Sequence, residues 1–192
     1  YAADLMVHKV AVGASLGGAI TALLPFGTII ITPLFGNLYD MKGRGADIMI
    51  LGAVLLIFVH ALFSIPFLKQ TPVAIFLIIV LGIGFSLVPS AMWPSVPKII
   101  PEKQLGTAYA MIFWVQNWGL MGVPALIGWV LDKYCITGTR LVDGVAVSNY
   151  NYTLPMIIFT GFGVLALIFA LLLKVEDRKK KYGLQLPNIA KQ

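Results

Sequence analysis

The sequence predicts an all-α, polytopic membrane protein with about five transmembrane helices. Of its 192 residues, 59% are hydrophobic and only 11% are charged, whereas a soluble domain carries charge at about a quarter of its positions. The charges are also clustered, because none falls between Lys9 and Asp40 or between Asp47 and Lys69. Both uncharged runs are long enough for a helix to cross the bilayer core, which takes about 20 apolar residues.

A β-barrel is the other structure that can span a membrane, and its strands of about ten residues alternate apolar and polar side chains. The segments LGAVLLIFVHALF (51–63) and IIFTGFGVLALIFALLL (157–173) show no such alternation. The pattern therefore favours helices. We expect spans near 12–37, 47–66, 73–97, 105–131 and 154–174.

Lysine and arginine are unequally divided between the two sides of these spans. One side holds Lys42, Arg44, Lys98, Lys103, Lys174, Arg178, Lys179, Lys180, Lys181 and Lys191, and the other holds Lys9, Lys69, Lys133 and Arg140. Because cytoplasmic loops carry the excess of basic residues, the first side is predicted to be cytoplasmic. Residues 1–11 are then expected to form an outer loop, residues 12–174 the membrane helices, and residues 175–192 a polar, partly disordered cytoplasmic tail.

The net charge of +6 raises the question of nucleic acid as a partner. Basic residues at membrane edges explain this charge, so we expect a lipid bilayer and no nucleic acid. The single Cys135 excludes a disulfide within the chain and a CxxC metal site. Two histidines and one cysteine on different segments form no catalytic constellation, so the sequence predicts no enzyme, no metal and no cofactor.

The stretch GNLYDMKGRG, which begins at Gly36, lies between the first two spans on the predicted cytoplasmic side. Gly36 would allow a helix to approach closely, and Gly43 would permit a tight reversal of the chain. Asp40 could face the positive N-terminal end of a neighbouring helix. Lys42 and Arg44 could reach lipid phosphates or an acidic partner. We take Gly36, Asp40, Gly43 and Arg44 as a candidate gating motif.

This Gly-x-x-x-Asp-x-x-Gly-Arg pattern resembles the loop signature of the major facilitator superfamily of secondary transporters. In that family the signature recurs between the second and third helices of each six-helix half, with a basic residue after the aspartate. Met41 stands at that position here, which suggests the copy in the C-terminal half. The resemblance implies that the five spans are helices 8–12 of a twelve-helix fold and that an N-terminal six-helix half is a missing partner. Residues 1–11 would finish the loop after helix seven.

A second resemblance lies in AMWPSVPKIIPEKQLGTAYAMIFWVQNWGL, which begins at Ala91. This stretch is similar to a branch of the superfamily that includes lysosomal dipeptide transporters and bacterial relatives. It implies transport of short peptides without fixing the substrate. The matching residues are Trp93, Pro94, Pro101, Glu102, Gln104, Leu105, Gly106, Thr107, Ala108, Tyr109, Gln116, Asn117, Gly119 and Leu120.

Polar and aromatic residues gather in the fourth span. At 100° per residue, Tyr109, Gln116 and Asn117 share one face of that helix. An unpaired amide in hydrocarbon is costly, so Gln116 and Asn117 must face protein or water. They could bond to a neighbouring helix or line a substrate path. The candidate path residues are Tyr109, Gln116, Asn117, Trp114, Trp118 and Trp93, the last of which could instead belong to an interfacial aromatic belt.

These observations predict a secondary transporter that moves a small polar solute, short peptides in the first instance, by alternating access. Another carrier of the same superfamily, for a drug, sugar or organic anion, is the alternative, followed by a non-transporting membrane scaffold. The intramembrane His60 is interpreted as a structural residue that bonds to a neighbouring helix. The expected location is the bacterial inner (plasma) membrane, or the lysosomal membrane if the source is a eukaryote.

Overall fold

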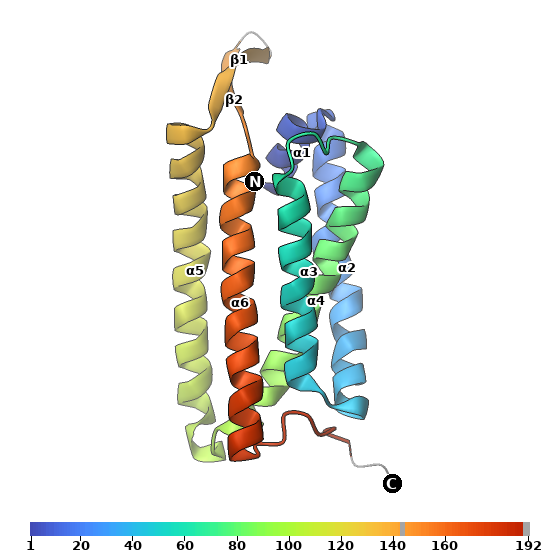
Figure 1. The fold of residues 1–192 in the computed structure, drawn as a ribbon, viewed down its shortest axis with the longest axis vertical. Helices are drawn as coiled ribbons and strands as arrows, with labels where there is room; N and C mark the ends of the chain where they lie inside the picture. The colour runs from blue at the N-terminus through green and yellow to red at the C-terminus, as the bar shows by residue number, and fades with distance from the viewer. Residues whose placement is uncertain (143–144, 190–192) are drawn as a thin grey trace.

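The computed structural model describes residues 1–142 and 145–189, and it is built mainly from long helices (Figure 1). Five of the helices within that part of the chain are long and apolar enough to cross a membrane, as the sequence predicts. The elements in chain order are α1 (Ala2–Val10), α2 (Ala14–Lys42), α3 (Gly45–Ser64), α4 (Thr71–Ile99), a 3-10 turn (Glu102–Gln104), α5 (Leu105–Tyr134), β1 (Ile136–Val142), β2 (Val145–Tyr150) and α6 (Thr153–Lys180).

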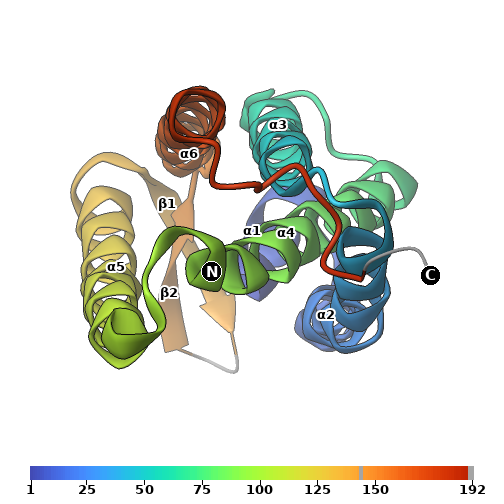
Figure 2. The same cartoon turned by 90° about the horizontal axis from the view of Figure 1, so that it is seen from below.

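The long helices pack unevenly. Helix α3 packs along both α4 and α6, and α2 packs along α4, whereas α5 has only sparse contacts with α4 and α6. Figure 2 shows α2 and α5 at opposite sides of the bundle, with α4 between them. Most of α5 is therefore left uncovered by the rest of the described chain.

Glycines allow α3 to approach its neighbours closely. A Cβ atom at Gly52 of α3 would lie 2.8 Å from the Val88 side chain and 3.0 Å from the carbonyl oxygen of Gly84 on α4. At Gly163 of α6, a Cβ would lie 2.9 Å from the Ile57 side chain on α3. Because lipid supplies no hydrophobic drive between helices, such close backbone contact is a main source of association in membranes.

We therefore expect Gly52→Leu to lower the free energy of unfolding, by about 1–3 kcal/mol as is usual for overpacking, since the new side chain has no room between α3 and α4. Gly161→Leu is the matched control, because nothing lies within 4 Å of a Cβ at Gly161. Thermal melting of the two purified variants in detergent measures the difference. Equal melting temperatures would show that the α3–α4 contact is not close in solution.

Residues 1–11 are not the loop that the sequence analysis expected. Residues 2–10 form α1, which ends at Ala11 in the left-handed conformation (φ 60°). Leu5, Met6 and Val10 are buried in it. A helix of only nine residues is too short to span a bilayer, which is why hydropathy alone did not separate it from a loop.

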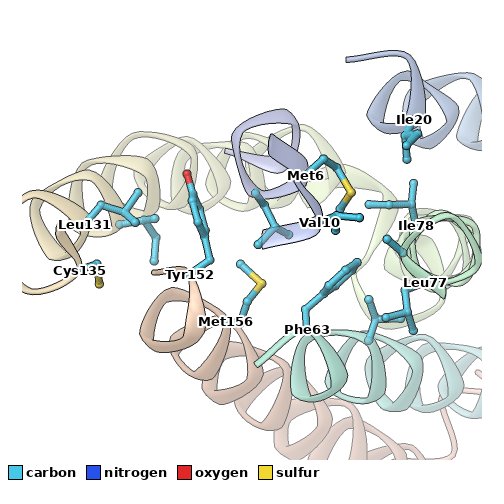
Figure 3. Packing of buried hydrophobic residues seen from close by; sticks show 14 of the residues in the cluster. Met6, Val10, Ile20, Phe63, Leu77, Ile78, Leu131, Cys135, Tyr152 and Met156 are labelled. Carbon is cyan, nitrogen blue, oxygen red and sulfur yellow. The ribbon is translucent and has the colours of Figure 1, made fainter. Parts of the chain in front are cut away.

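The main hydrophobic core surrounds α1 at the end of the bundle that is predicted to be the outer one. Figure 3 shows labelled side chains from α1, α3, α4 and α6 gathered in this cluster, with Cys135 at its edge. Tyr152 and Met156 bring the start of α6 into the same core. This core holds the outer ends of the helices together.

A short β-hairpin follows α5 in this mainly helical fold. Strands β1 and β2 pair antiparallel, with Thr139 opposite Ser148 and Arg140 opposite Val147. The Tyr150 hydroxyl donates a 2.8 Å hydrogen bond to Asp132 at the end of α5, and the Tyr150 amide donates to His8 Nδ1 at 3.3 Å. The hairpin thus ties α5 to α1 on the outer side.

The C-terminal tail, which is predicted to be cytoplasmic, also differs from the expectation. Helix α6 continues to Lys180, beyond the predicted end at residue 174. The following residues fold back against the bundle, and Leu184 is completely buried. A single buried leucine in a polar segment gives little signal in a hydropathy average, which is why the sequence predicts partial disorder for this segment.

Candidate functional site

The middle of α5 presents amide and indole groups that no other described element covers. Gln116 and Asn117 are exposed, and they lie about 18 Å along the helix from its start at Leu105, near mid-depth. The Asn117 side-chain amide donates a 2.8 Å hydrogen bond to the Phe113 carbonyl in the same helix. Only residues of the outer end, Ile127, Val130 and Leu131, are buried.

Trp114 and Trp118 lie on the same uncovered stretch. Their ring centroids are 6.1 Å apart in an edge-to-face arrangement, and the residues are 64% and 56% exposed. A geometry of this kind stabilises a pair of aromatic rings beyond the area that they bury. The two indoles therefore support each other while keeping large apolar faces available.

Trp93 and Tyr109 belong to a separate cluster, nearer the end of the bundle that is predicted to be cytoplasmic. The Trp93 ring of α4 stacks on Phe113 of α5 at 4.9 Å between centroids and lies 5.9 Å from Tyr109. The Tyr109 hydroxyl donates a 3.4 Å hydrogen bond to the carbonyl of Trp93. The structure thus brings Trp93 and Tyr109 together but not with the amides and indoles of the middle of α5.

Pro97 explains why Tyr109 bonds at that position. A proline inside a helix has no N–H, so the carbonyl four residues earlier loses its donor. For Pro97 in α4, that carbonyl belongs to Trp93, and Tyr109 from α5 supplies a substitute donor. The spacing between Trp93 and Pro97 was a signal in the sequence that could have predicted this contact.

The candidate gating motif covers the end of α2 and the short loop that follows it. Gly36 and Asp40 lie in α2, and Gly43 and Arg44 form the loop to α3. Gly43 adopts a φ of 70°, a conformation that glycine reaches without steric cost, and the chain reverses there. A Cβ at Gly36 would meet nothing within 4 Å, so no described helix makes the close approach that was expected at this glycine. Arg44 is exposed and lines an open pocket with Met41, Lys42 and Pro187.

Asp40 bonds to the C-terminal tail within the described chain. Its carboxylate accepts a 2.7 Å hydrogen bond from the Asn188 side-chain amide. Its main-chain carbonyl accepts two further bonds, from the amides of Asn188 and Ile189 at 3.0 Å each. We expected a helix N-terminus to face this carboxylate. Among residues 1–142 and 145–189, the C-terminal tail takes that place instead.

The outer side carries a polar cavity of about 220 Å³, lined in part by His8, Lys9, Lys69 and Tyr150. Burial is the main cause that lowers the pKa of Lys9, and the nearby positive charge of Lys69 lowers it further. The Lys9 ammonium donates a 2.7 Å hydrogen bond to the Ile65 carbonyl. Burial and a hydrogen bond to Asp4 raise the pKa of Tyr152. These contacts fasten α1 to its neighbours.

His60 is held within the bundle. Its Nδ1 atom lies 2.7 Å from the Leu56 carbonyl, and its ring stacks on Phe159 of α6 at 5.3 Å between centroids. The hydrogen bond lies within α3, so among the described contacts only the stacking on Phe159 reaches a neighbouring helix, and the interhelical hydrogen bond predicted for His60 is not formed there. Among residues 1–142 and 145–189, no group of three or more His, Cys, Asp or Glu side chains is placed to hold a metal ion.

Comparison with known proteins identifies the family of this helical bundle. The family model of the Major Facilitator Superfamily matches residues 1–188. The chain belongs to the Major Facilitator Superfamily. Members of this superfamily are integral membrane transporters rather than enzymes, in agreement with the predicted fold class and with the five apolar helices.

Among curated proteins, this superfamily chain is similar to proteins named lysosomal dipeptide transporter MFSD1. It is 36% identical to the one from Homo sapiens over 104 residues, which are 54% of this chain and 21% of the relative. It is 31% identical to the one from Danio rerio over 155 residues, 81% of this chain and 29% of the relative. It is 33% identical to the one from Mus musculus over 115 residues, 60% of this chain and 24% of the relative.

The chain therefore spans only 21–29% of the length of these relatives. No solved structure matches it.

Proposed function

We propose that this chain is the C-terminal part of a secondary transporter that moves short peptides by alternating access. Its substrate site would be shared with an N-terminal six-helix half. The observation that carries the proposal is the uncovered stretch of α5, where Gln116 and Asn117 lie at mid-depth. In transporters of this kind, substrate sites lie near the bilayer midplane between two repeats.

The amides of that stretch require a polar or protein environment. An unpaired amide in hydrocarbon costs several kcal/mol, and no described residue from another helix bonds to the side chain of Asn117. A second helical half that faces α5 across a water-filled path would meet this need. The side chains of Gln116 and Asn117 would then offer hydrogen-bond donors and acceptors to a solute in the path.

Peptide chemistry fits these groups. Asparagine and glutamine side chains each present a carbonyl acceptor and an NH₂ donor, the same pair that a peptide bond presents. The indole faces of Trp114 and Trp118 would form apolar walls for side chains of the solute. The names of the relatives, lysosomal dipeptide transporter MFSD1, favour the same solute class.

Tyr109 and Trp93 would lie at the cytoplasmic end of this path. Their contact joins α4 to α5, and its position in the chain places it about 12 Å nearer the cytoplasm than Asn117. In this proposal, the α4–α5 contact narrows the path on that side. The end of α2 that carries Asp40 would close the same side by meeting a helix N-terminus of the other half.

Uptake of labelled dipeptides into proteoliposomes that contain the full-length protein tests the proposal. We expect saturable uptake that unlabelled dipeptides inhibit and that free amino acids do not. A carrier for sugars or drugs is the second candidate, because the exposed Trp114–Trp118 pair would also stack on such solutes. Uptake of a sugar, drug or organic anion without uptake of dipeptides would overturn the peptide assignment.

The shared site leads to a prediction for residues 1–192 alone. This part of the protein supplies only one wall of the path, so we expect the purified chain to bind dipeptides too weakly for calorimetry to detect. The full-length protein, titrated under the same conditions, is the positive control. Tight and saturable binding to residues 1–192 alone would contradict a site shared between two halves.

A further inference from the structure

The segment of residues 183–189, here called the strap, lies across the cytoplasmic ends of the helices. Helix α6 ends at Lys180, its capping residue Lys181 has a φ of 55°, and Gly183 has a φ of 81°, so the chain turns back toward the bundle. Figure 2 shows this segment passing from the end of α6 across the end of α3 to the end of α2. It thereby reaches the loop of the candidate gating motif.

Leu184 anchors the strap. It is completely buried, and its amide donates a 3.0 Å hydrogen bond to the carboxylate of Asp177 near the end of α6. Its carbonyl accepts a 2.9 Å bond from the amide of Gly45 at the start of α3. One leucine therefore joins the strap to both α6 and α3.

Hydrogen bonds from main-chain and side-chain groups join the rest of the strap to α2, α4 and the α2–α3 loop. The Arg44 amide donates to the Gln185 carbonyl at 3.1 Å. Lys98, at the cytoplasmic end of α4, donates to the carbonyls of Gly183 at 3.1 Å and Leu186 at 2.7 Å. Asn188 completes the contact through the carboxylate and the carbonyl of Asp40.

The loop has no side chain where the strap passes. A Cβ at Gly43 would lie 2.4 Å from the Gln185 carbonyl oxygen, 2.5 Å from the Leu186 carbonyl carbon and 2.7 Å from the Pro187 nitrogen. These are backbone atoms, so no side-chain rotation could relieve the clash. Gly43 thus serves both the reversal of the loop and the fit of the strap.

We propose that the strap is an autoinhibitory contact that delays closure of the cytoplasmic side. While docked, it occupies the Asp40 carboxylate through Asn188 and fills the space beside Gly43. A helix of the other half can engage Asp40 closely only after the strap has left. This inference rests on the proposed function, in which the loop meets the other half.

The composition of the strap suits a reversible contact. Leu184 is its one completely buried apolar side chain, whereas Leu186 and Ile189 are 64% and 56% exposed. Its remaining contacts are hydrogen bonds that water can replace. A segment held in this way opens more easily than the helices beneath it.

The test compares Leu184→Ser with Leu186→Ser in the full-length protein, because the two variants make the same chemical change at a buried and at an exposed position of the strap. Hydrogen exchange reports docking directly. The amides of Arg44 and Gly45 donate hydrogen bonds to carbonyls of the strap. They should exchange about tenfold faster in Leu184→Ser and at the wild-type rate in Leu186→Ser. Asn188→Ala, which frees the Asp40 carboxylate without touching the buried leucine, is the second variant.

Autoinhibition predicts a gain of transport. Leu184→Ser and Asn188→Ala should raise the initial rate of dipeptide uptake about twofold or more, and Leu186→Ser should not. Wild-type amides that already exchange as fast as those of Leu184→Ser would show that the strap is not docked. Faster exchange with unchanged or lower uptake would show that the strap only stabilises the loop.

A readout without substrate separates this inference from the proposed function. In inside-out vesicles, a cysteine introduced by Asn117→Cys reacts with an impermeant maleimide only while the cytoplasmic side is open, and the native Cys135 is buried. Release of the strap by Leu184→Ser should slow this labelling about twofold, because closure becomes more frequent. Equal or faster labelling would overturn autoinhibition, even in a protein that transports no peptide.

Discussion

Alanine at Gln116 or Asn117 of the full-length transporter is expected to lower dipeptide uptake about tenfold, which corresponds to the loss of about 1.4 kcal/mol of interaction. The reason is that each substitution removes a donor and an acceptor from the middle of the path. Loss of a hydrogen bond to a bound solute typically costs about 0.5–1.5 kcal/mol, and more when the partner is charged. A peptide terminus would be such a partner.

The same variants should keep nearly their wild-type melting temperature in detergent. Asn117 bonds only to a carbonyl of its own helix among the described contacts, so little packing is lost. Gln104→Ala is the matched control, because Gln104 is an exposed glutamine just before α5 and outside the proposed path. If uptake per folded molecule is unchanged, the amides bond between helices instead, a contact worth about 0.6 kcal/mol on average.

Asp40→Asn in the full-length protein is expected to shift the transporter toward the state that is open to the cytoplasm. A carboxylate near a helix N-terminus contributes about 0.3–1 kcal/mol, so the ratio of the two states should change up to about fivefold. An asparagine at position 40 still offers a side-chain oxygen to the Asn188 amide. The substitution therefore tests the charge of Asp40 without removing the acceptor that the strap uses.

Cysteine labelling from the two sides of the membrane measures this shift. Asp132→Asn is the control, since Asp132 lies at the outer end of α5 and bonds to Tyr150, far from the cytoplasmic loop. Expression should stay close to wild type for both variants. Accessibility that is unchanged on both sides would remove the gating role assigned to Asp40.

The membrane helices could be predicted from the sequence because each depends on a long apolar run. The second span was expected near 47–66 and is α3, Gly45–Ser64. The short elements escaped prediction because they depend on a few specific contacts. Helix α1 is stabilised by burial against α2 and α4, and the strap depends on Leu184; neither contact leaves a periodic pattern.

The candidate site could be predicted only in part. The sequence placed Gln116 and Asn117 at mid-depth on α5, and the structure leaves both exposed there. It also assigned Trp93 and Tyr109 to the path but did not predict their contact across α4 and α5, which follows from the carbonyl that Pro97 leaves free. In the proposed function, the surface that faces Asn117 belongs to the N-terminal half, so its residues have to be read from that half's sequence.

Among residues 1–142 and 145–189, helix α5 is attached to other elements mainly at its two ends. Phe113 and Tyr109 attach the inner end to Trp93, and Ile127, Val130 and Leu131 attach the outer end to the core. Between these attachments, a Cβ at Gly119 or Gly122 would meet nothing within 4 Å, and Pro124 lacks the N–H that would complete the helical ladder. If both attachments persist, α5 can change shape only by bowing, with its greatest displacement in the turns around Gly119. The width of the path at mid-depth could then vary while the spacing of the helix ends stays constant.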